Sequence, residues 1–404
     1  MRDTAPAPVA PPTTSPSAAA PVVGDRGPGT ERPGAWRAVG VFLAVATVLF
    51  VVAGLSVAHL GYTGTDLVQE RFPNRPWLNA WVHWDGRWYG DIAERGYWAY
   101  EPGVQGPVAF FPAYPVLMRA LGAVIGSPLL AGIVLTVAGG AAAAGLFLAW
   151  LGRRVSPAAA WTALGLFLLY PFAYYLYGAV YADAVFIAAA IGSFLLVERD
   201  RPVLAGLVGA VATAARPLGF VLVVALVVLV VERRGGLRNV PWRDAGVLLA
   251  AAGIGAFALY CWSRFGSPVA FVEAQKGWDQ DPGPATWFKL QFFEDVRDVR
   301  SPLAWLVFVS HPVLTAGALA LVPLVVRRLG WAYGIFVVLS VGLAAVSTKN
   351  FFGMSRYVLA AFPCFAVAGE VLASRVRLRA ATLAASGAGL VAATSFFARG
   401  HYLS

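Results

Sequence analysis

The residues best suited to chemistry lie between positions 81 and 115, where the sequence reads WVHWDGRWYGDIAERGYWAYEPGVQGPVAFFPAYP. This stretch combines four acids, two arginines and many aromatic residues in a chain made largely of Ala, Leu, Val and Gly. Charged side chains are costly beside apolar segments, so their concentration in one stretch marks a candidate active site. The charged residues are Asp85, Asp91, Glu94, Glu101, Arg87 and Arg95.

A short amphipathic helix can present these acids at a membrane surface. Trp81, Trp84, Trp88 and Ile92 recur at helical spacing and give one apolar face that can lie on lipid. Carboxylates on the other faces are then open to water and close to lipid headgroups, where an enzyme would meet a lipid-linked substrate. The alternative is an interfacial helix whose Trp and Tyr side chains only anchor the loop at headgroup level.

The composition is that of a polytopic membrane protein. Hydrophobic residues make up 59% of the chain and charged residues 13%, whereas an average soluble domain has about 25% charged residues. The net charge is +10, but the arginines fall in short clusters between apolar segments, as orientation signals do. A nucleic-acid partner is therefore not expected. Cys261 and Cys364 lie in or beside apolar segments and are expected to be small buried residues.

The expected fold is an all-α bundle of about eleven transmembrane helices. Residues 1–34, rich in Pro, Ala, Ser and Thr, predict a disordered cytoplasmic tail, and residues 35–404 form the membrane domain. We expect each of the apolar segments to cross the bilayer as a helix. They run at about 36–60, 128–151, 157–178, 181–197, 202–215, 217–232, 245–263, 302–326, 330–347, 357–374 and 380–397.

Arginine clusters at alternate junctions predict the orientation in the cell membrane. If the clusters face the cytoplasm, every short loop obeys the positive-inside rule. This requires that residues 108–125 do not cross fully, which Pro112 and Pro115 favour. Three polar stretches, at about 61–107, 264–300 and 348–356, then lie outside. The clusters contain Arg153, Arg154, Arg199, Arg201, Arg233, Arg234, Arg238, Arg243, Arg327, Arg328, Arg375, Arg377 and Arg379.

Several motifs along the chain resemble those of the PIG-V-like mannosyltransferases and occur in order. This family is related to GPI mannosyltransferase 2 and belongs to the GT-C class of polytopic glycosyltransferases. The most specific match is Trp84-Asp85 followed by AFFPAYP at 109–115, and a Ser-Arg-Tyr motif at 355–357 matches near the end. The resemblance covers about residue 36 to the C-terminus. It implies inverting transfer of a mannosyl group from a polyprenyl-phosphate donor to an extracytoplasmic glycolipid, glycan or protein. Heavy use of Ala, Gly and Arg favours a bacterial source.

The implied reaction needs one general base, because a lipid phosphate departs without strong acid help. Asp85 is the expected base for the acceptor hydroxyl, a role that contributes about 10²–10⁴-fold to a rate. Its alternative role is to cap the surface helix. Asp91 and Glu94 are the next candidates for the base or for acceptor binding.

The departing phosphate needs fixed positive charge, and arginine supplies it through planar donors. Arg216 and Arg356 are the expected phosphate ligands, although either could instead extend to the membrane interface. Asp183 could hold the donor sugar or neutralise an arginine, and the sequence does not choose. The other expected substrate-binding residues are His83, Trp84, Arg87, Phe111, Tyr114, Gln275, Trp278, Lys349 and Tyr357.

No cofactor or metal is expected. The four histidines show no HxH or HExxH spacing, and the chain has neither a P-loop nor a GxGxxG motif. Two other functions remain open: a GT-C transferase that uses another lipid-linked sugar, and a lipid or small-molecule transporter. A transporter would place charged groups near the bilayer midplane on broken helices.

Overall fold

The computed structural model describes residues 34–63, 71–278 and 283–403, and this part of the chain is helical without strands. The expected tail lies almost entirely outside these residues. Every expected apolar segment contains helix, so the all-α fold is confirmed. The segments form α1 (Ala35–Leu60), α5 (Pro128–Leu151), α6 (Pro157–Leu168), α8 (Asp183–Glu198), α9 (Pro202–Thr213), α10 (Phe220–Arg233), η4 and α11 (Trp242–Ala251 and Ala252–Phe265), α15 (Pro302–Ala320), α16 (Val322–Leu329), α17 to α18 (Trp331–Ser347), α19 (Met354–Ala360), α20 (Phe362–Ala373) and α21 (Val376–Ala398).

A serine followed by a proline begins three of these helices. The Oγ atoms of Ser127, Ser156 and Ser301 each accept a hydrogen bond from the backbone N–H three residues later, at 3.2, 3.3 and 3.4 Å. The proline occupies the first helical position, where a backbone N–H has no acceptor within the helix, so the lack of an N–H in proline costs no hydrogen bond. The sequence therefore sets the start of α5, α6 and α15 locally.

Five helices are long and apolar enough to cross a membrane, and the pair α19 and α20, bent by 71°, counts as a sixth if it forms one span. The other apolar helices are shorter, so the expected number of eleven full spans stays a prediction. The five are Ala35–Leu60, Pro128–Leu151, Trp242–Phe265, Ala304–Leu329 and Val376–Ala398. Many Leu and Val side chains on α1 are exposed, as expected for a surface that faces lipid rather than water.

Residues 108–125, which were predicted not to cross the membrane fully, form a turn followed by a short helix. The segment begins with a 3₁₀ turn, η1 (Pro107–Ala109), and continues as α4 (Ala113–Ile125) with 13 residues. At 1.5 Å per residue α4 is about 20 Å long, which is short of the roughly 30 Å of a bilayer core. It packs against α5 and against α3 (Asp85–Arg95).

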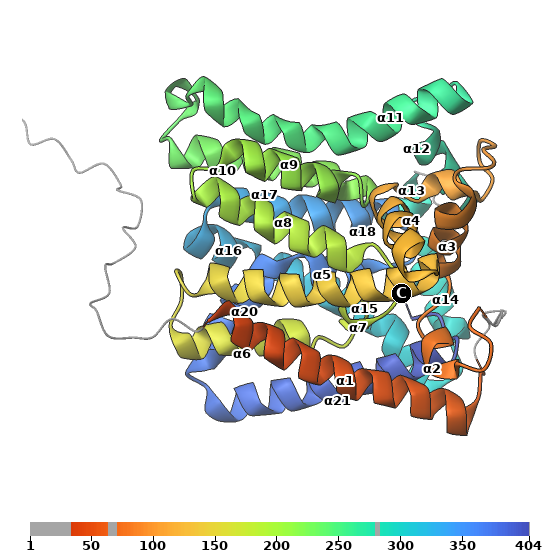
Figure 1. Cartoon of the computed structure of the whole chain (residues 1–404). Helices are drawn as coiled ribbons and strands as arrows, with labels where there is room; N and C mark the ends of the chain where they lie inside the picture. The colour runs from red at the N-terminus through yellow and green to blue at the C-terminus, as the bar shows by residue number, and fades with distance from the viewer. Residues whose placement is uncertain (1–33, 64–70, 279–282, 404) are drawn as a thin grey trace, which may run out of the picture. The chain divides into compact units, whose positions relative to one another are not determined.

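The arginine-rich junctions and the acid-rich stretches lie at opposite ends of the helix bundle (Figure 1). The junctions after α5, α8, α10, α16 and α20 share one end. The short helices α2 (Pro76–Asn79), α3, α4, α12 (Ala270–Gln275), α13 (Pro284–Trp287) and α14 (Leu290–Asp298) gather at the other end. This separation meets the requirement of the positive-inside prediction; which side of the membrane each end faces stays a prediction.

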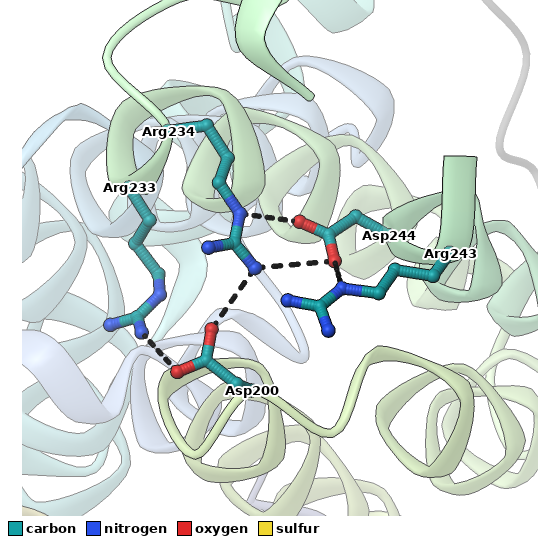
Figure 2. Close-up of polar contacts among 5 residues, drawn as sticks. All are labelled: Asp200, Arg233, Arg234, Arg243 and Asp244. Atoms are coloured by element: carbon teal, nitrogen blue, oxygen red, sulfur yellow. Dashed lines mark hydrogen bonds and ion pairs between the residues drawn. The ribbon is translucent and has the colours of Figure 1, made fainter. Parts of the chain in front are cut away.

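Ion pairs hold the arginine-rich end together, as Figure 2 shows. Asp244 is buried, and its carboxylate accepts hydrogen bonds from Arg234 at 2.6 and 3.3 Å. Asp200 accepts from Arg234 at 3.1 Å and from Arg233 at 3.4 Å, while Arg243 lies 3.6 Å from Asp244. These contacts join the α8–α9 junction to the junction between α10 and η4.

Candidate active site

Four charged residues from distant parts of the chain meet at the acid-rich end. We call Asp85, Asp183, Arg216 and Arg356 the charge cluster. Asp85 is the first residue of α3, Asp183 the first of α8, Arg216 precedes the 3₁₀ turn η2 (Pro217–Gly219), and Arg356 lies on α19. Both acids occupy first helical turns, where the helix dipole favours negative charge. All four were predicted site residues, and the structure brings them together.

The charges of the cluster alternate along a chain of contacts. An Nη1–H of Arg356 donates to Oδ2 of Asp85 at 2.9 Å, and Nη2 of Arg356 lies 3.2 Å from Oδ2 of Asp183. Arg216 Nη1 donates to Oδ1 of Asp183 at 2.6 Å. The exposed fractions of the side chains are 26% for Asp85, 15% for Arg356, 0% for Asp183 and 7% for Arg216. The chain of charges therefore opens to solvent at Asp85 and ends deep at Arg216.

Aromatic rings line both guanidinium groups. Arg356 lies over the ring of Tyr181 at 4.7 Å and over Tyr175 at 5.2 Å, while Arg216 lies over Tyr357 at 4.7 Å. Ring faces attract cations, so these tyrosines restrict where the arginines can move. The backbone N–H of Asp85 also donates to the hydroxyl of Tyr181 at 3.3 Å. Tyr181 thus ties the start of α3 to the arginine that Asp85 contacts.

The backbone before Asp85 is strained. Trp84 has φ +51°, a region that side chains other than glycine rarely adopt, and such strain persists only where the surroundings hold it. Here His83 is buried, with Nε2 3.1 Å from the carbonyl oxygen of Ala398, and the Trp84 ring packs edge-on against Tyr402. His83 therefore holds the loop against α21, and its predicted contact with substrate stays a prediction.

The remaining acids of the first loop lie outside the charge cluster. Asp91 pairs with Arg71 at 3.3 Å and with Arg95 at 3.2 Å, and Glu94 is exposed. Arg87 is half-buried on the same helix. Tyr89, on the same helix, is buried, and burial together with the nearby Asp85 carboxylate raises the pKa of its phenol, so it stays protonated.

The aromatic residues after this loop build the support for α3 and α4. Phe111 is buried against Phe257 and Phe271, and the Tyr114 hydroxyl donates to the Gly132 carbonyl at 2.7 Å. Their predicted contact with substrate is untested, and their observed contacts are with the helix core.

Residues of the second loop complete this support. Gln275 donates to the Ala109 carbonyl at 3.3 Å. Trp278 packs edge-on against Phe110 and against Trp88. Trp88 lies on α3, the helix that begins at Asp85. Both residues thus reach the first loop without joining the charge cluster.

The outer stretches also contact one another. Tyr100 donates to Glu273, and burial together with that carboxylate raises the pKa of Tyr100 to about 12. Lys289 donates to the Thr348 carbonyl beside Lys349, and burial lowers the pKa of Lys289 to about 8. Lys349 itself is half-buried. The three stretches predicted to lie on one side therefore form one continuous assembly.

Sequence reasoning missed Tyr175, which lies beside Arg356. The apolar segment 157–178 predicted one helix, but α6 ends at Leu168 and a separate turn, α7 (Tyr174–Tyr177), follows. Pro171 explains the break, because proline cannot donate within a helix and disfavours helical backbone before it. The sequence signal for this break was Pro171, which lies within a run of aromatic residues.

No protein-family model matches the chain, and no curated protein matches its sequence. Solved structures of the oligosaccharyltransferase from Archaeoglobus fulgidus show a distant similarity. AglB in complex with an inhibitory peptide and a dolichol-phosphate is 12% identical with a TM-score of 0.43, over 89% of this chain and 55% of that chain. The enzyme tethered to an acceptor peptide with the NVT sequon is 13% identical with a TM-score of 0.46, over the same shares. The chain thus spans about half the length of these proteins, and the resemblance to PIG-V-like mannosyltransferases stays a prediction.

Proposed function

We propose that the chain is a GT-C membrane glycosyltransferase that moves a mannosyl group from a polyprenyl-phosphate donor to an acceptor hydroxyl. The observation that supports this most is the charge cluster, in which a solvent-reaching carboxylate contacts an aromatic-lined arginine. A carboxylate can accept a proton, and arginine binds phosphate. Both groups lie at the acid-rich end, which we place on the extracytoplasmic side on the basis of the arginine-rich junctions at the opposite end.

Asp85 acts as the general base. Its carboxylate takes the proton of the acceptor hydroxyl while the hydroxyl oxygen attacks the anomeric carbon of the donor sugar. The bond from that carbon to the phosphate oxygen breaks, and the polyprenyl phosphate leaves with the bonding electrons. A single displacement of this kind inverts the anomeric centre.

Arg356 and Arg216 stabilise the negative charge that develops on the departing phosphate. Preorganised donors in a site of low dielectric contribute more than the same groups in water. Asp183 neutralises both arginines and keeps them in place. Of the two roles that the sequence left open for Asp183, this favours neutralising an arginine over binding the donor sugar. Mannose as the donor sugar comes from the sequence resemblance.

A transporter is less well supported by the placement of charge. Asp85 and Asp183 are the first residues of α3 and α8, so the charge cluster lies where these helices begin, at the acid-rich end of the bundle (Figure 1). Transporters tend to hold charged groups near the bilayer midplane.

The test is transfer by purified protein in lipid nanodiscs supplied with polyprenyl-phosphate-mannose and membrane acceptors. Asp85→Asn is expected to lower the rate by at least about 10²-fold with unchanged folding. Glu370→Gln is the matched control. Glu370 contacts Arg328 at 2.9 Å, the same distance as between Asp85 and Arg356, so the control also removes a carboxylate charge from a contact with an arginine. Full activity of Asp85→Asn would exclude Asp85 as the base, and absence of transfer from any polyprenyl-phosphate sugar would exclude the function.

A further inference from the structure

Arg356 contacts two carboxylates that differ in how firmly they are held. Asp183 is fully buried, and its other oxygen binds Arg216 at 2.6 Å. Asp85 is 26% exposed, and Arg356 is its one ion-pair partner among the described residues. One carboxylate is therefore fixed inside the protein, and the other lies at the solvent side of the same guanidinium.

The Arg356 guanidinium also carries an unused donor. Its Nε atom is buried and has no hydrogen-bond partner within the described part of the chain. Arginine presents five N–H donors in a fixed planar fork, and leaving one of them buried and unpaired is unfavourable. The guanidinium therefore has a donor to offer an anion that neither Asp85 nor Asp183 uses.

We propose that Arg356 exchanges partners when the donor lipid binds: the lipid phosphate displaces Asp85, while Asp183 keeps the guanidinium in place. This inference rests on the proposed function. In this structure the contact with Arg356 occupies the Asp85 carboxylate. Once the phosphate takes that contact, Asp85 is released to accept a proton. The base thus becomes available only when a leaving group is present.

The exchange makes an unusual prediction, because the variant that loses the base should bind the lipid phosphate more tightly. Asp85 and the phosphate compete for one guanidinium, so a neutral side chain at position 85 removes the competitor. We expect Asp85→Asn to lower the Kd for farnesyl phosphate about tenfold, the change that corresponds to loss of roughly one charge-assisted hydrogen bond. Asp85→Glu keeps the competing charge and should bind nearly as the wild type does.

The measurement is calorimetric titration of the full-length protein in detergent, with size-exclusion chromatography to check folding. Farnesol serves as the ligand without phosphate, and Glu370→Gln as the matched variant; neither should show a gain. Unchanged or weaker binding of farnesyl phosphate by Asp85→Asn overturns the exchange. An equal gain with farnesol also overturns it, and an equal gain with inorganic phosphate overturns the assignment to a lipid.

The two proposals fail separately. If Asp85→Asn loses transfer without a gain in affinity, the catalytic role of Asp85 stands and the exchange is wrong. If the gain appears but no polyprenyl-phosphate sugar supports transfer, the exchange stands and the proposed function is wrong.

Discussion

Replacing Asp183 by asparagine tests how much the protein depends on the buried part of the charge cluster. The change preserves side-chain volume and removes one negative charge at a position with 0% exposure. Arg216, only 7% exposed, then keeps its positive charge without a counter-ion. Breaking a buried ion pair in this way costs about 3–5 kcal/mol, a large part of the 5–15 kcal/mol that typically stabilises a folded protein.

A double variant separates the unpaired charge from other effects of the substitution. Asp183→Asn with Arg216→Met removes both partners, and methionine can fill the space over the Tyr357 ring. We expect the double variant to be more stable than Asp183→Asn alone, because no buried charge lacks a partner. Glu370→Gln, at a half-exposed pair, should cost no more than about 1 kcal/mol.

The assay is unfolding of detergent-purified protein by heat and by denaturant, followed by tryptophan fluorescence. Two results would refute the reasoning. One is an Asp183→Asn variant within about 1 kcal/mol of the wild type, since a lone buried charge should cost more. The other is a double variant no more stable than the single one.

Two further predictions concern the ends of the bundle. Asp244→Asn weakens the contacts with Arg234 in Figure 2, so we expect a thermal midpoint several degrees lower with normal transfer per folded molecule; an unchanged midpoint contradicts this. At the other end, burial lowers the pKa of Lys289 from 10.5 to about 8. Between these values the unfolded chain binds more protons, so stability should rise with pH in this window. Thermal midpoints should rise less in Lys289→Met, and an equal rise in both proteins would exclude Lys289 as the cause.

The helices were predictable because their signals are local. Apolar runs, serine caps and prolines at first positions lie within each segment, so α5, α6 and α15 begin where the sequence indicates. The division into arginine-rich and acid-rich ends also followed from composition along the chain. The length of each helix did not follow in this way, because the break near Pro171 falls inside a segment that is apolar throughout.

The candidate site was predictable in its members but not in its contacts. Chemistry singled out Asp85, Asp183, Arg216 and Arg356, and the structure joins them. Which acid meets which arginine depends on how α3, α8 and α19 pack, and no local pattern encodes that. Tyr175 was missed for the same reason, since its contact is with a residue that lies far away in sequence.

The order of the charge cluster along the chain has a consequence for biosynthesis. Asp183 and Arg216 are 33 positions apart, so this pair can form soon after α9 enters the membrane. Asp85 can pair with Arg356 only after the ribosome has added the 271 positions that separate them. At ordinary speeds of translation this synthesis takes roughly 15–55 s. A nascent chain that stalls before α19 therefore carries most of its helices but lacks the guanidinium that joins the two acids. Under the proposed function, such a fragment would be embedded in the bilayer yet unable to consume donor lipid.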